Sequence, residues 1–173
     1  MIRKSIITLI LVFATFPVLF SQSGNKIIKD PLGGGEMLYG EIDTSALSKP
    51  PFSDWFIRGL ETYSPDTETI VRLINTMAPE YYYVIVMGTW CPDSRREVPR
   101  MLSVLYSAGV PASHITIYAV DRELKARRTP VRDLDIEKVP TLIVSLKDEE
   151  AGRIIESPVV SVEKDLLNIL PGN

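Results

Sequence analysis

The stretch that decides the fold is YYYVIVMGTWCPDS, residues 81–94. Residues 82–87 form a largely β-branched and aromatic run, which is typical of a strand buried inside a sheet. Gly88 opens the exit from this strand, and Pro92 suits the first turn of a helix because that turn needs no N–H from it. The segment therefore predicts a buried strand that passes directly into a helix beginning near Cys91.

Outward from this segment the pattern predicts alternating helices and strands. Upstream we expect a helix from residue 53 and a second one, capped by Ser64, whose apolar residues repeat at three- and four-residue steps up to residue 77. Downstream the helix that starts near Cys91 ends at Gly109. The elements expected after it are strands at 115–120, 141–146 and 152–156, a short helix within 122–135, and a closing helix at 161–170.

These elements imply an α/β fold. A strand–helix–strand crossover requires a parallel pair of strands, and the tight turn at 147–151 makes the last two strands antiparallel. We therefore expect a central mixed β-sheet flanked by helices on both faces. The chain divides into a leader at 1–23, a lead-in segment with little periodicity at 24–50, a helical extension at 51–80 and the main domain at 81–173.

Size, composition and charge limit the function classes. The chain has 173 residues, 45% of them apolar and 24% charged, which suits one domain with a single core. Its formal net charge of −3 argues against nucleic acid as the main partner, because phosphate binding needs a basic surface. His114 is the one histidine, and no pattern of Cys or Asp accompanies it. We predict no metal site, no cofactor and a monomeric protein.

The first 23 residues have the pattern of a secretory signal peptide. Arg3 and Lys4 give a positive start, residues 6–20 are mostly apolar, and Ser21-Gln22-Ser23 places small residues where a signal peptidase reads. The apolar run of 15 residues is shorter than the roughly 20 needed to span a bilayer as a helix. We expect a cleaved leader, no membrane span after cleavage and a periplasmic or secreted protein. An uncleaved membrane anchor is the alternative.

Cys91 is the only cysteine, so no disulfide can form within the chain. In an exported protein such a cysteine is either a free reactive thiol or an intermolecular partner. The N–H groups and dipole of a helix start favour a charged sulfur, which is the nucleophile in thiol–disulfide exchange. The charge of Asp93 opposes this effect, whereas Ser94, one helical turn further on, can donate a hydrogen bond to the sulfur. The alternative is that Cys91 is a small buried apolar side chain.

Several positions together resemble the thioredoxin family over residues 82–170, about half of the chain. Trp90-Cys91-Pro92-Asp93-Ser94 stands where thioredoxins carry Trp-Cys-x-x-Cys, and Pro99 where they have a helix-kinking proline. Val139-Pro140-Thr141 matches the cis-proline loop of the family, 49 residues after the cysteine. The resemblance implies a thioredoxin-like fold in which a cis peptide bond precedes Pro140 and this loop lies against Cys91.

The resemblance also implies roles for individual residues. Cys91 and Ser94 take the catalytic positions. The substrate-binding positions fall on Trp90, Pro92, Asp93, Val139 and Pro140, where the backbone of Val139 contacts an extended substrate and Trp90 forms an apolar wall. Ser94 replaces the second cysteine of the family, and Ile85 stands where the family has a buried acid that assists this cysteine. The chain therefore lacks the thiol with which a thioredoxin releases its own mixed disulfide.

Two functions fit this pattern. The first is monothiol thiol–disulfide exchange through Cys91, as disulfide isomerisation or mixed-disulfide reduction, with thiol- or disulfide-bearing proteins or small thiols as partners. The second is a redox-inactive thioredoxin-fold module that binds extended peptides or acts as a chaperone. The charged residues 122–128 are expected to form a solvated loop, or else to recruit a partner.

Overall fold

The computed structural model describes residues 24–147 and 149–170. The predicted leader at 1–23 lies outside the described residues. In chain order, the elements are β1 (Lys26–Lys29), β2 (Glu36–Ile42), α1 (Thr44–Leu47), α2 (Ser53–Thr62), α3 (Thr67–Thr76), β3 (Tyr81–Met87), α4 (Pro92–Ser107), the 3-10 helix η1 (Ala112–His114), β4 (Ile115–Ala119), the 3-10 helix η2 (Pro130–Asp133), β5 (Thr141–Leu146), β6 (Glu149–Ile155) and α5 (Val162–Ile169).

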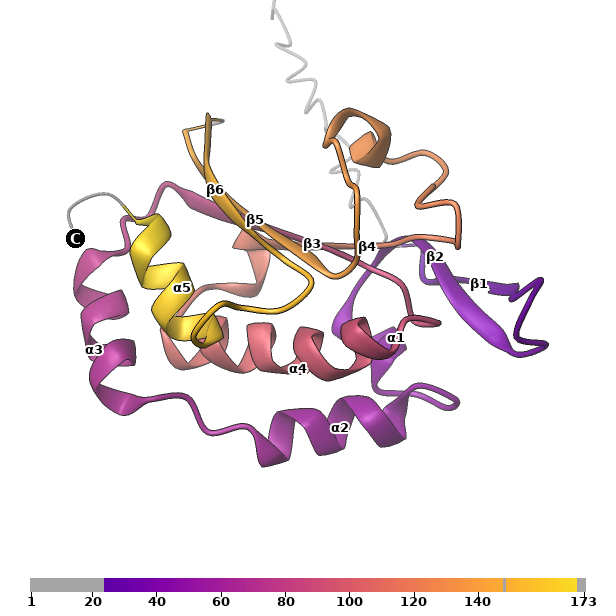
Figure 1. Ribbon diagram of the computed structural model, residues 1–173, viewed down its shortest axis with the longest axis horizontal. Coiled ribbons are helices and arrows are strands. Elements are labelled where there is room, and N and C mark those ends of the chain that lie inside the picture. Colours follow the sequence, from indigo (N-terminus) through magenta and orange to yellow (C-terminus); the bar gives the residue numbers. More distant parts are fainter. Residues whose placement is uncertain (1–23, 148, 171–173) are drawn as a thin grey trace, which may run out of the picture.

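The strands form one mixed sheet in the order β1-β2-β4-β3-β5-β6. β3 and β4 are parallel, and every other neighbouring pair is antiparallel. The predicted parallel pair and the predicted antiparallel pair of last strands are both confirmed. With its flanking helices, the sheet has the mixed α/β architecture that the sequence predicts (Figure 1).

The register of the sheet brings three segments to one edge. Met87, the last residue of β3, pairs with Ala119 at the end of the parallel strand β4. Val86 pairs with Thr141 at the start of the antiparallel strand β5. The residues that follow β3, the residues that follow β4 and the loop that precedes β5 therefore meet at this edge, beside the β1–β2 hairpin (Figure 1).

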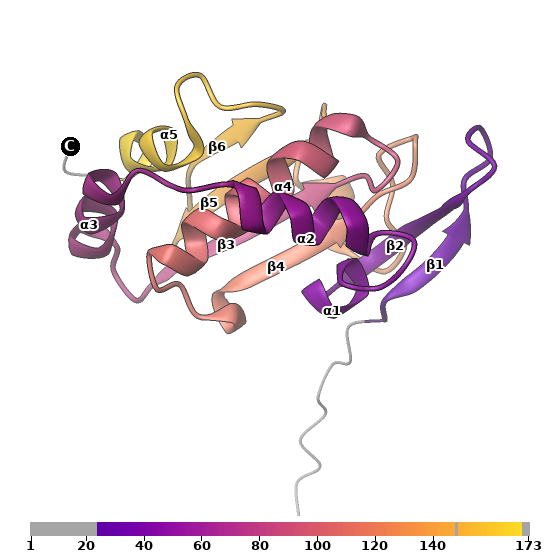
Figure 2. The ribbon, with the colours of Figure 1, turned by 90° about the horizontal axis from the view of Figure 1, so that it is seen from below.

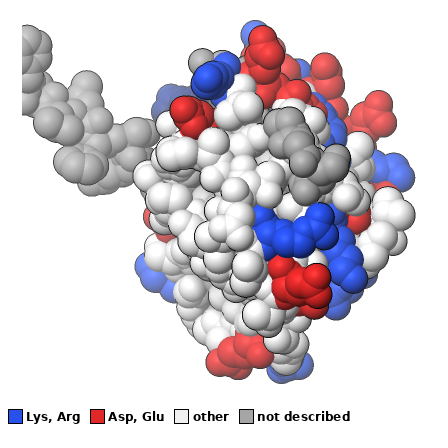
Figure 3. Space-filling view, turned by 90° about the vertical axis from the view of Figure 1, so that its left-hand side faces the viewer, with Lys and Arg blue, Asp and Glu red and all other residues white. Residues whose placement is uncertain are grey.

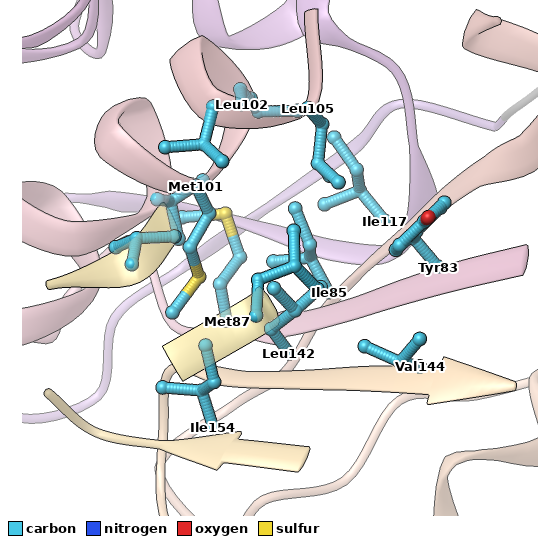
Figure 4. Packing of buried hydrophobic residues seen from close by; sticks show 14 of the residues in the cluster. Tyr83, Ile85, Met87, Met101, Leu102, Leu105, Ile117, Leu142, Val144 and Ile154 are labelled. Carbon is cyan, nitrogen blue, oxygen red and sulfur yellow. The ribbon is translucent and has the colours of Figure 1, made fainter. Parts of the chain in front are cut away.

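The main hydrophobic core lies between the sheet and the helices. All five α-helices of the described chain contribute buried side chains to it, and they lie on one side of the sheet (Figures 1 and 2). Met101, Leu102 and Leu105 of α4 point down onto Ile85 and Leu142 of the central strands (Figure 4). Burying each such side chain fully stabilises the fold by about 1.5–3 kcal/mol.

The other face of the sheet has a thinner cover. Residues 121–139 cross it and contain η2, a single 3-10 turn where the sequence predicted a short helix within 122–135. A second, smaller cluster of buried side chains forms between this segment and the sheet: Val86, Cys91, Tyr118, Val120, Val131 and Val139. The sequence predicted helices on both faces of the sheet. The structure instead has α-helices on one face and a single 3-10 turn on the other.

The N-terminal part of the described chain belongs to the sheet. The sequence analysis named no strand in the lead-in segment at 24–50, but β2 pairs with β4 and β1 pairs with β2. Met37, Leu38 and Ile42 of β2 are buried. The domain boundaries predicted at residues 50 and 80 stay predictions.

Helix termini show why local signals succeed or fail. Ser161, at the predicted start of the closing helix, caps α5, since its side chain accepts from the Lys164 N–H. For α3 the predicted cap Ser64 is wrong, because Asp66 lies next to the helix and accepts from the N–H of Thr69 at 2.9 Å.

The end of the molecule that carries α3 and α5 mixes both signs of charge. Lys and Arg side chains on this face lie among Asp and Glu, next to a broad uncharged area (Figure 3). No helix within residues 24–147 and 149–170 combines the length and the apolar character needed to cross a membrane.

Candidate functional site

Cys91 lies in the turn between β3 and α4. It is the N-cap residue of α4, with Pro92 as the first helical residue, and its N–H donates to the Gly88 carbonyl at 2.9 Å. Its side chain belongs to the smaller apolar cluster and only 8% of the residue is exposed. The cysteine therefore has the helix-start position that the sequence predicts, on the thinly covered face of the sheet.

The loop before β5 lies directly against the sulfur. The Cys91 Sγ is 3.3 Å from the carbonyl oxygen of Val139, to which the thiol donates a hydrogen bond. The peptide bond between Val139 and Pro140 is cis, as the resemblance predicts. Because β3 and β5 pair antiparallel next to this point, the sheet register itself holds loop and cysteine together. The structure thus joins Cys91, Val139 and Pro140 into one site.

Ser94 is fully buried beneath the same turn. Its Oγ accepts a hydrogen bond from the Gly88 N–H at 3.1 Å. Among the hydrogen bonds of the described residues, none joins Ser94 to Cys91, so the donation to the sulfur that the sequence suggested is not present. In this arrangement Ser94 stabilises the β3–α4 turn.

The charges next to the sulfur are balanced by ion pairs. Asp93 forms a salt bridge of 2.7 Å with Arg96, one turn further along α4. Arg95 turns back and donates from Nε to the carbonyl of Thr89 at 2.6 Å. Arg96 also pairs with the buried Glu97 at 2.6 Å, so its charge is shared between two carboxylates and offsets only part of the repulsion between Asp93 and a charged sulfur. Pro92 is exposed on the solvent side of the turn.

Trp90 is held firmly at the edge of the site. Its indole Nε1 donates to the Val120 carbonyl at 2.9 Å. A Cβ at position 88 would lie 2.6 Å from the Trp90 ring, so only glycine allows the ring to occupy this place. The indole packs against the cluster that contains Cys91. Trp90 therefore has the position of an apolar wall.

Two residues that sequence reasoning missed complete the surroundings of Trp90. The Arg122 guanidinium lies over the indole, with Cζ 4.9 Å from the ring centre. Arg122 also donates to both carboxylate oxygens of Asp30, each at 2.8 Å. These two hydrogen bonds hold the pKa of Asp30 well below its usual range. The expected solvated loop at 122–128 thus begins with an arginine fixed to the site.

The β1–β2 hairpin is anchored to the site a second time. The Leu38 N–H of β2 donates to Oγ1 of Thr89, the residue before Trp90, at 3.1 Å, and Thr89 is fully buried.

The only local signal for Arg122 was its place just after a strand whose end meets the end of β3. Asp30 lies 92 residues from its partner, and no periodicity connects the two.

The described residues contain no group of three or more His, Cys, Asp or Glu side chains placed to hold a metal ion. What the site offers chemically is one thiol, one backbone carbonyl next to it, an aromatic wall and a cation.

No family model and no curated protein sequence matches the chain. Among solved structures, it is similar to a protein of unknown function from Pseudomonas aeruginosa, with 16% identity, a TM-score of 0.48, and coverage of 66% of this chain and 78% of the other. It is similar to Trxlp from Edwardsiella tarda, with 19% identity, a TM-score of 0.37, and coverage of 62% and 94%. It is also similar to thioredoxin f from spinach chloroplast, with 13% identity, a TM-score of 0.35, and coverage of 58% and 87%.

Proposed function

We propose that this chain is a monothiol protein that carries out thiol–disulfide exchange through Cys91. The observation that supports this most directly is the contact between the Cys91 sulfur, at the first turn of α4, and the Val139 carbonyl before Pro140. We further propose that it acts in the periplasm or after secretion, because residues 1–23 have the pattern of an export signal.

The contact suggests how ionisation opens the site. As a thiol, Cys91 donates to the Val139 carbonyl. When the thiol loses its proton, the carbonyl oxygen loses its donor and repels the negative sulfur. Sγ becomes free to attack, and the Val139 oxygen becomes free to accept a substrate N–H. Deprotonation therefore provides the nucleophile and a backbone contact for the substrate in one step.

The exchange then runs in two balanced steps. The Cys91 thiolate attacks one sulfur of a substrate disulfide, so that a mixed disulfide forms, the substrate S–S bond breaks and the second substrate sulfur leaves as a thiolate. A second thiol, from the substrate protein or from a small thiol, attacks the mixed disulfide and regenerates the Cys91 thiolate. This second step needs a partner because Ser94 carries no sulfur. The chain is therefore suited to isomerisation and to mixed-disulfide reduction.

Mixed-disulfide trapping tests this function. We expect the protein to accumulate a covalent adduct with a short peptide disulfide, visible by mass spectrometry and released by reductant, because no internal thiol resolves it. Ser94→Ala should form the adduct as well, whereas Cys91→Ala should form none. Absence of an adduct with the intact protein would contradict an exchange function.

One observation favours the second candidate, a redox-inactive peptide-binding module: only 8% of Cys91 is exposed. In that case Trp90, Val139 and Pro140 would hold an extended segment without covalent chemistry. Cys91→Ala would then bind a reduced peptide as tightly as the intact protein, as measured by fluorescence anisotropy. An intact protein that forms no adduct, together with a fully binding Cys91→Ala variant, would establish this candidate.

A further inference from the structure

Arg122 has an unusually fixed position for an arginine at the edge of a site. Nε and Nη2 donate to the two oxygens of Asp30, whose residue is only 8% exposed. The guanidinium lies over the Trp90 ring, and the indole of Trp90 is itself fixed by its hydrogen bond to the Val120 carbonyl. A planar fork held in this way loses little further freedom when it forms another hydrogen bond.

One nitrogen of the guanidinium remains for such a bond. A guanidinium has five N–H donors, and Nη1 of Arg122 donates to no acceptor among the described residues. The side chain is 31% exposed, so an approaching molecule can reach it. The hydrogen bond to Asp30 raises the pKa of Arg122. The guanidinium is linked to the site through Trp90, because it lies over an indole that packs against the cluster containing Cys91.

Space for a bound segment adjoins this group. Arg122 lines a pocket of about 510 Å³ between the β1–β2 hairpin and the residues after β4. Apolar side chains of the hairpin line it, together with the charged side chains of Lys29, Asp121 and Glu123. The pocket adjoins the guanidinium, which lies over Trp90, the residue next to Cys91.

We propose that Arg122 orients the substrate: Nη1 donates to an oxygen acceptor, a backbone carbonyl or a carboxylate, on the segment whose disulfide Cys91 attacks. This assignment rests on the proposed exchange function. Asp30 is a positioning residue, which holds the guanidinium over Trp90. Because exchange requires the attacking and attacked sulfurs to approach in a defined geometry, an anchor beside the disulfide raises the rate of attack.

The test compares two symmetrical peptide disulfides that differ only in Glu or Gln next to the cysteine. The rate of adduct formation is measured for the intact protein, for Arg122→Met and for the double variant Asp30→Asn/Arg122→Met, which leaves no unpaired buried carboxylate. We expect both variants to react about tenfold more slowly with at least one peptide, which is the effect of losing one charge-assisted hydrogen bond. Lys125→Met, at an exposed lysine three residues away, is the control and should stay within about twofold.

The outcomes separate the two acceptors. A loss confined to the Glu peptide assigns the acceptor to a carboxylate, and an equal loss with both peptides assigns it to the backbone carbonyl. A small uncharged thiosulfonate, which has no peptide to orient, should modify Cys91 at the intact rate in the double variant. Peptide rates within about twofold of the intact protein, or a thiosulfonate rate that falls as far as the peptide rates, would overturn the assignment. An intact protein that forms no adduct would instead overturn the exchange function, and this inference with it.

Discussion

At the scale of single residues, Ser94 has a structural role that does not depend on any chemical one. It occupies the position of a second cysteine by resemblance, yet its hydroxyl is fully buried and accepts the Gly88 N–H. The turn that presents Cys91 therefore depends on a polar atom at position 94, whichever role that atom has in the reaction. A sulfur there would accept this hydrogen bond more weakly, at a cost of about 1 kcal/mol.

Under the proposed exchange function, Ser94→Cys should change the type of reaction. It places a second thiol one helical turn after Cys91, so we expect the mixed disulfide to be resolved internally and an intramolecular disulfide to form. Mass spectrometry after reaction with a peptide disulfide should show two released peptide thiols and no adduct. Ser94→Ala, with no second thiol, should keep the adduct. A persistent adduct in Ser94→Cys would show that position 94 cannot reach the sulfur.

Single residues also show where prediction from sequence stops. Cys91 at a helix start and the cis bond before Pro140 follow from short motifs with local physical meaning. The pairing of Arg122 with Asp30 joins segments 92 residues apart and has no such motif. It depends on the strand register, which places the end of β4 beside the β1–β2 hairpin. The sequence also does not show which partner the Ser94 hydroxyl takes, since the Gly88 N–H and the Cys91 sulfur both lie in the same β3–α4 turn.

At the scale of elements, two contacts bind the β1–β2 hairpin to the site. One is the Arg122–Asp30 ion pair, and the other is the hydrogen bond from the Leu38 N–H to Thr89. The sequence missed both strands because β1 has four residues and Gly40 interrupts the apolar pattern of β2. Their stability comes from pairing with β4, far along the chain, and not from local propensity. β3, β5 and α4 were predictable from their own residues, because the two strands are mostly apolar runs and the helix begins at Pro92 and ends before Gly109.

The contribution of the Arg122–Asp30 ion pair to stability should fall in acid. Arg122 holds the pKa of Asp30 below its usual range, so the folded protein binds this proton less readily than the unfolded chain does, whose Asp pKa is about 3.9. The Asp30 carboxylate therefore stabilises the fold above about pH 4, and this contribution is lost as the pH falls further. Urea unfolding between about pH 2.5 and pH 6 should show a shallower acid loss for Asp30→Asn than for the intact protein. Asp133→Asn, at an exposed aspartate, should follow the intact protein. Parallel curves for the intact protein and both variants would show that the Arg122–Asp30 ion pair does not stabilise the fold.

At the scale of the whole molecule, the described chain is one sheet with all its α-helices on one side (Figure 2). The hairpin extends the sheet and also closes part of the main core. The cluster that holds α2 and α4 against the central strands includes Leu38 of β2. The N-terminal segment is thus as much a part of the packed molecule as the strand that carries the site.

Two leucines of the hairpin test this integration. Leu38 is 1% exposed and Leu32 is 79% exposed. We expect Leu38→Ala to lower the free energy of unfolding by about 2–5 kcal/mol, because it leaves a cavity in the core. Leu32→Ala should change it by no more than about 0.5 kcal/mol. Urea denaturation followed by circular dichroism measures both, and equally small effects would mean that the hairpin is peripheral to the fold.

The uneven cover of the sheet has a consequence for any attempt to alter this protein. Residues 121–139 contribute buried side chains to the cluster that contains Cys91 and none to the large cluster beneath the helices, since the two clusters lie on opposite faces. The surroundings of the thiol and the bulk of the apolar core can therefore be altered separately. Substitutions beneath the helices should change stability and leave the cover of the sulfur in place, whereas substitutions at 121–139 that keep the Arg122–Asp30 pair should change this cover and leave the large cluster intact.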